Sequence, residues 1–122
     1  MVQLLNVDYI MMITDFKVGD AIKVKEGIVC PDMQDLIISG WQGRISAITK
    51  DDNGHLLVYI EWDSITLENM PDVFIDDSEE NGLGFASMSL FDNEIELTKS
   101  RDTKEDRDKA IEKIHDEYMV FW

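Results

Sequence analysis

The side chains of this sequence that could do chemistry are carboxylates, and half of them are concentrated in one segment. Between Asp51 and Thr98 the chain has 13 Asp or Glu residues and no Lys or Arg, whereas the whole chain carries a formal charge of −15. Clustered carboxylates repel one another and destabilise the folded chain unless positive charge lies among them. Calcium binds about six to eight oxygen atoms in irregular geometry, so it is the natural ligand for such a segment.

Six acidic residues are the candidate metal ligands, and they come from the stretches 28–40 and 63–80. They are Asp32, Asp35, Asp63, Asp76, Glu79 and Glu80. Each has a structural alternative. A Pro-Asp pair is common in turns, where the carboxylate accepts a main-chain N–H. Asp63 follows an expected strand and is equally well suited to cap a turn, and the acids near residue 80 also fit a solvated helix face.

The spacing of these acids does not fit an EF-hand. When Gly82 is placed at the sixth position of the EF-hand loop, Met88 falls where the bidentate Glu is required. When Gly54 is placed there, Ile60 falls at that last position. We therefore expect a calcium site that is assembled from separate loops. Two further acids of the acid-rich segment, Asp51 and Asp52, are expected to form a hairpin turn rather than to bind metal.

Several other functions are excluded or disfavoured by composition. A pI near 4.2 argues against binding to nucleic acid or to an anionic membrane, because both require clustered basic residues. His55 and His115 are isolated, and Cys30 has no basic neighbour that would activate it, so we expect no enzymatic activity. A single cysteine and the lack of a basic leader in Met1–Ile13 predict a cytoplasmic protein. The alternative function is an acidic module that docks a basic protein partner without metal.

Alternation and turn residues predict four short strands, at residues 21–25, 43–50, 55–62 and 94–97. The stretch 28–40 is expected to be a long loop. Asp51–Gly54 is predicted to be the turn of a tight hairpin. Asp63–Thr66 is predicted to form a second tight turn after the third strand.

Two helical segments are expected in the second half of the chain. Pro71 followed by Asp72–Asn81 predicts a short helix that closes at Gly82. A C-terminal helix is predicted at 102–118, with Asp102 or Thr103 as its N-cap and Glu105 or Asp106 completing a capping box. Its apolar stripe can pack against a small barrel and consists of Ala110, Ile111, Ile114 and Tyr118.

These elements predict a mainly β protein, a small antiparallel SH3-like barrel with a short helical turn and a C-terminal α-helix. The chain is expected to be one domain, 1–122, with residues 1–15 as an N-terminal extension, and to be monomeric.

Several pieces of the sequence resemble a known family. They are Phe16–Asp20, Pro31–Asp32 with Asp35, Gly40–Ile45, Trp62–Leu67, Met70–Pro71, Glu79–Leu83, Met88–Leu90 and Arg101–Thr103. With these pieces, the chain from about residue 16 to 107 resembles the small acidic calcium-binding proteins of cyanobacteria. The resemblance implies a cytosolic protein that binds Ca²⁺ through acidic side chains without an EF-hand and acts as a buffer or regulator of free calcium.

Overall fold

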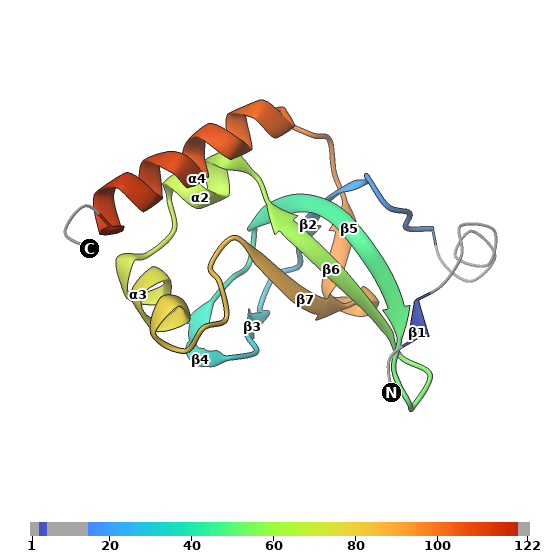
Figure 1. Ribbon diagram of the computed structural model, residues 1–122. Coiled ribbons are helices and arrows are strands. Elements are labelled where there is room, and N and C mark those ends of the chain that lie inside the picture. Colours follow the sequence, from blue (N-terminus) through green and yellow to red (C-terminus); the bar gives the residue numbers. More distant parts are fainter. Residues whose placement is uncertain (1–2, 5–14, 120–122) are drawn as a thin grey trace.

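The computed structural model describes residues 3–4 and 15–119, with side chains for 15–117. Five antiparallel strands form the main sheet in the order β7-β6-β5-β2-β8, and β1 pairs with the far end of β5 (Figure 1). The strands are β1 (Gln3–Leu4), β2 (Ala21–Val24), β3 (Val29–Cys30), β4 (Met33–Ile37), β5 (Gln42–Lys50), β6 (Leu56–Trp62), β7 (Ser87–Phe91) and β8 (Ile95–Leu97). The helices are α2 (Ser64–Glu68), α3 (Asp72–Glu80), the 3-10 turn η1 (Asp92–Glu94) and α4 (Lys104–Met119).

The strands predicted from alternation are confirmed as β2, β5, β6 and β8. In β6 every second residue from Leu56 to Trp62 is buried, as a strand with one face on the core requires. The turn before it is held by Asp51, whose carboxylate accepts the N–H groups of Asn53 and His55 at 2.9 and 2.8 Å. Gly54 in that turn has φ +83°, which favours glycine.

Three expectations about the fold are corrected, and the structure adds one strand. The stretch 28–40 contains the small hairpin β3–β4 rather than only a loop. Asp63–Thr66 begins helix α2 rather than forming a tight turn. Strand β7 was not predicted. Finally, the sheet is open, because β7 and β8 lie at opposite edges, and helices take a share similar to that of strands, so the fold is mixed α and β.

One hydrophobic core joins the elements from β2 to α4. Trp62 is fully buried and meets Trp41 edge to face with ring centroids 5.3 Å apart, while Trp41 meets Phe74 of α3 at 5.4 Å. Such aromatic pairs stabilise a fold beyond the area that they bury. The segment before β5 is thereby packed against both the sheet and α3.

Helix α4 begins with the predicted capping box. The N–H of Thr103 donates to the Asp106 carboxylate at 3.0 Å, and the N–H of Asp106 donates to the Thr103 hydroxyl at 3.1 Å. Ala110 and Ile114 are buried as expected, but the helix lies alongside α2 rather than directly on the sheet (Figure 1). The fourth residue of the predicted stripe, Tyr118, lies outside the described side chains.

Candidate functional site

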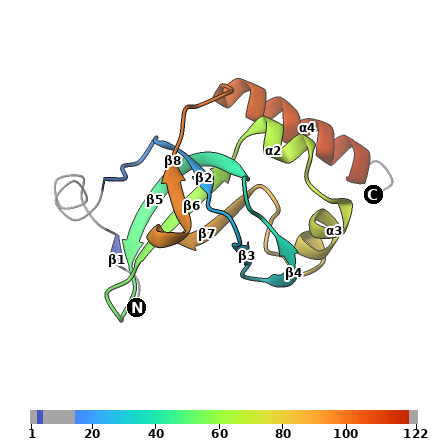
Figure 2. The ribbon, with the colours of Figure 1, turned by 180° about the vertical axis from the view of Figure 1, so that it is seen from behind.

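Hairpin β3–β4 lies beside helix α3 at one end of the molecule (Figure 2). The pKa of the buried Cys30 thiol is raised, first by burial and then by the negative charges of Asp32 and Asp77. The main-chain N–H groups of Asp32 and Met33 act in the opposite direction and lower it. Asp32 is in the turn of the hairpin and Asp77 is in α3. The fold therefore brings together the two acidic stretches that the sequence left far apart.

Most of the acids at this end are open to solvent. The exposed acids are Asp32, Asp35, Asp76, Glu79 and Glu80. Within the described chain, no ion pair joins any of them to a basic side chain. The last turn of α3 also has no basic residue. These carboxylates are consequently available to a cation.

The acids are not gathered into a finished site. Among the residues that the structure describes, no group of three or more His, Cys, Asp or Glu side chains is placed to hold one metal ion. The structure thus brings the hairpin and α3 to the same end without arranging their carboxylates around a common point.

Asp63 is a structural cap, the alternative to metal binding that the sequence left open for this residue. It is the N-cap of α2, and its Oδ1 accepts the N–H of Thr66 at 2.8 Å. Arg101 donates to Oδ2 and Oδ1 at 2.7 and 3.1 Å, and the side chain of Asp63 is only 6% exposed. Because both oxygens are engaged, we leave Asp63 out of the candidate metal ligands.

A polar network that local sequence patterns do not predict attaches the start of α4 to the sheet. The side chain of Asp102 is only 3% exposed, accepts the N–H of Ser64 at 2.6 Å and forms an ion pair with Arg44. Arg107 donates to the Trp62 carbonyl at 2.7 Å and pairs with Glu61 at 3.2 Å.

One sequence signal could have revealed part of this network. Because the segment 51–98 has no Lys or Arg, any of its acids that becomes buried must find a base outside the segment. Arg101 and Arg107 follow the segment closely, at the start of a predicted helix.

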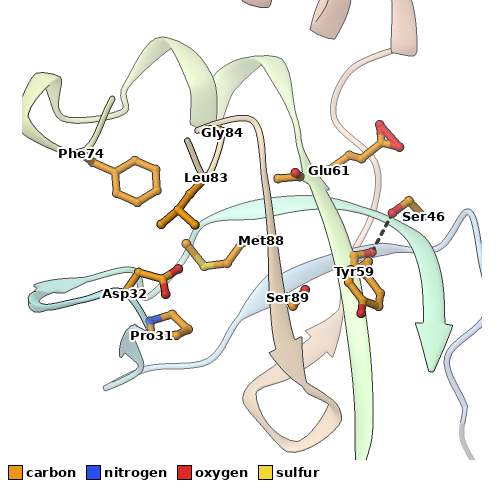
Figure 3. Close-up of a pocket in the computed structure, with 11 residues that line it drawn as sticks. Pro31, Asp32, Ser46, Tyr59, Glu61, Phe74, Leu83, Gly84, Met88 and Ser89 are labelled. Atoms are coloured by element: carbon orange, nitrogen blue, oxygen red, sulfur yellow. Dashed lines mark hydrogen bonds between the residues drawn. The ribbon is translucent and has the colours of Figure 1, made fainter. Parts of the chain in front are cut away.

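A groove of about 650 Å³ wraps around strand β7 (Figure 3), and we call it the β7 groove. Its lining is Pro31, Asp32, Ser46, Tyr59, Glu61, Phe74, Leu83, Gly84, Ser87, Met88 and Ser89. It thus combines two carboxylates with apolar and small polar side chains, and it has no Lys or Arg.

None of the helices in the described part of the chain is both long and apolar enough to cross a membrane. Comparison with known proteins gives no match: no family model, no curated protein and no solved structure matches this chain.

Proposed function

We propose that this protein binds Ca²⁺ through carboxylates of hairpin β3–β4 and helix α3 and acts as a buffer or regulator of free calcium. The proposed ligands are Asp32, Asp35, Asp76, Glu79 and Glu80. The order of the main strands, with a hairpin in the first long connection and a 3-10 turn before the last strand, also supports our proposal of an SH3-like fold whose sheet is open.

The observation that carries this proposal is that hairpin β3–β4, which holds Asp32 and Asp35, lies beside helix α3, which holds Asp76, Glu79 and Glu80 (Figure 2). Acids from two distant stretches share one end of the molecule, and those on its surface have no ion pair within the described chain. Like charges at short range repel, so a bound divalent cation lowers the free energy of this arrangement. Within the part of the chain that the structure describes, no ion pair of these five carboxylates has to be broken for the ion to bind.

Calcium suits this arrangement better than smaller or softer metals. Carboxylate oxygens are hard ligands, and Ca²⁺ accepts an irregular shell that can include water and main-chain carbonyls. Side chains at the surface can reorient toward the ion because packing does not hold them. We therefore propose that binding gathers carboxylates that are apart in the unbound protein and orders the hairpin against α3.

Calorimetric titration of three variants tests this assignment. The first variant carries Asp32→Asn and Asp35→Asn, the second carries Glu79→Gln and Glu80→Gln, and the third combines all four changes. Each of the first two removes two charges at nearly constant side-chain size. Each pair is expected to weaken calcium binding by about tenfold or more. Because both pairs serve one ion, the combined variant should lose less affinity than the sum of the two separate losses.

A matched control is available on α4. Asp108 and Glu112 are exposed, and Asp108→Asn with Glu112→Gln changes the net charge by the same amount at another place. This control should keep nearly full affinity. Undiminished calcium binding by the combined variant, or an equal loss in the control, would show that the ligands lie elsewhere or that the effect is one of net charge alone.

A further inference from the structure

Strand β7 is an edge strand whose sequence carries none of the usual protection. It pairs with β6 on one side, and no strand of the described chain pairs with its other side. Natural proteins protect such edges with Lys, Pro or bulges, because unpaired N–H and C=O groups accept further strands. Ser87–Phe91 contains neither Lys nor Pro, and its pairing with β6 has no bulge.

The register shows which groups of β7 point outward. The N–H of Trp62 donates to the Ala86 carbonyl at 3.0 Å, and Ile60 pairs with Met88 two residues further on. Because main-chain groups alternate in an antiparallel ladder, those of Ser87 and Ser89 face away from β6. The outward N–H of Phe91 is taken by the Glu94 carboxylate at 2.8 Å, so the open edge ends at Ser89.

The β7 groove provides surfaces on both sides of this edge. Figure 3 shows Asp32, Phe74 and Leu83 on one side of β7 and Tyr59 on the other. Leu83 is 55% exposed, so its apolar side chain is accessible to a ligand in the groove. An added strand alternates its side chains between two faces, so one set would meet the apolar hollow and the other set the outer face of the sheet.

Charge decides which kind of strand fits. The groove has two carboxylates and no basic side chain, and one of them, Glu61, is paired with Arg107 at 3.2 Å. Asp32 has no ion pair within the described chain. A second copy of this protein would bring another net charge of −15 to the same place. Like charges across an interface are strongly unfavourable, so the occupant must be basic and come from a different protein.

We propose that the β7 groove binds an extended basic segment of a partner protein, which adds as a strand along Ser87–Ser89. The segment would place apolar side chains against Leu83 and Phe74, and a Lys or Arg beside Asp32. Main-chain hydrogen bonds would supply affinity, and the alternate side chains would supply specificity.

Fluorescence anisotropy tests the proposal with a labelled peptide in which every second residue is Leu or Lys and the residues between them are Thr, so that Leu and Lys lie on the same face of the added strand. The titration is done at low salt with EDTA present, so that its outcome does not depend on calcium binding. We expect saturable binding, and no binding when every Lys of the peptide is replaced by Glu. A second peptide carries N-methyl groups on those alternate amides whose N–H would point toward β7. It should bind about tenfold more weakly, because N-methylation removes the hydrogen bonds to β7.

Two protein variants locate the contact. Ser89→Pro removes an N–H that points away from β6, so the hydrogen bonds between β7 and β6 stay intact, and edge strands tolerate proline at such a position. This variant should weaken peptide binding by about tenfold. Asp32→Lys should also weaken it, and the matched control Asp108→Lys on α4 should not. Amide shifts in an NMR titration should be largest at Ser87 and Ser89.

Two results would overturn the proposal. If the N-methylated peptide and Asp32→Lys both bind as tightly as their unmodified counterparts, the peptide is held by diffuse charge rather than as a strand. If the protein forms dimers that Ser89→Pro abolishes, the edge belongs to a second copy of the chain.

Discussion

Asp63 shows how a carboxylate of the acid-rich segment serves the fold. It caps α2 and forms two hydrogen bonds with Arg101 while almost fully buried. We expect Asp63→Ala to lower the free energy of unfolding by at least about 2 kcal/mol, because it removes a cap and leaves Arg101 without its partner. Urea denaturation measures this change.

The exposed Asp76 is the control for that measurement, and Asp76→Ala should change the unfolding free energy by less than about 0.5 kcal/mol. An Asp63→Ala protein as stable as the wild type would contradict the structural role of this ion pair.

Asp102 gives the pH dependence of stability a specific origin. Burial acts to raise the pKa of Asp102, but the N–H of Ser64 and the Arg44 guanidinium outweigh it, so the pKa lies below its ordinary value of 3.8. A lowered pKa in the folded state contributes stability above the unfolded pKa and loses it as pH falls through the folded pKa.

The stability difference between wild type and Asp102→Asn should therefore be constant from about pH 7 to 5 and should shrink below about pH 4. Unfolding free energies measured across this range test the prediction, with Asp108→Asn as the charge control. A difference that persists undiminished at low pH would assign the effect to packing.

At the scale of elements, the register of β5 on β6 depends on Gly43. A Cβ at this position would lie 2.3 Å from the Glu61 carbonyl oxygen and 2.8 Å from Ile60 Cγ2. Because the nearest atom is main chain, the strands must move apart, and we expect Gly43→Ala to lower the unfolding free energy by about 2 kcal/mol or more. Thermal unfolding measures it, with Ser46→Ala on the same strand as control. An unchanged midpoint would show that the hairpin can shift at this point.

The elements that sequence predicts correctly are those with local signals. Alternation predicts β6, reciprocal caps predict the start of α4, and Pro71 with Gly82 brackets α3. Strand β7 alternates polar and apolar residues from Ser87 to Leu90, but this run is only four residues long, and its partner β6 lies across a connection that contains two helices. Asp63 fits both a turn and a helix start, and the choice depends on the burial of Thr66 and Leu67 in the folded protein.

The candidate site was predictable only at the level of segments. The sequence indicated that acids of the 28–40 stretch could meet acids of the 63–80 stretch. In the structure, hairpin β3–β4 of the first stretch does lie beside α3 of the second. It could not separate Asp63 from the other candidates, because the partner that engages it, Arg101, lies 38 residues further along the chain. Long-range pairing of this kind is set by the topology rather than by local sequence.

At the scale of the whole molecule, the net charge of −15 predicts a response to salt. Raising KCl to about 0.5 M should raise the thermal midpoint of the metal-free protein, because monovalent ions screen exposed carboxylates. Millimolar Ca²⁺ should raise it further at that same salt concentration, since coordination adds to screening. If KCl alone reproduces the whole effect of calcium, the acids form only a repulsive surface.

The most direct test of calcium binding is a calorimetric titration of metal-stripped protein with Ca²⁺ in the presence of excess Mg²⁺. Mg²⁺ requires compact octahedral geometry and gives up its water reluctantly, so it should compete poorly for exposed carboxylates that are not arranged around one point. The account predicts a saturable calcium isotherm in excess Mg²⁺. The absence of saturable binding under these conditions would contradict it.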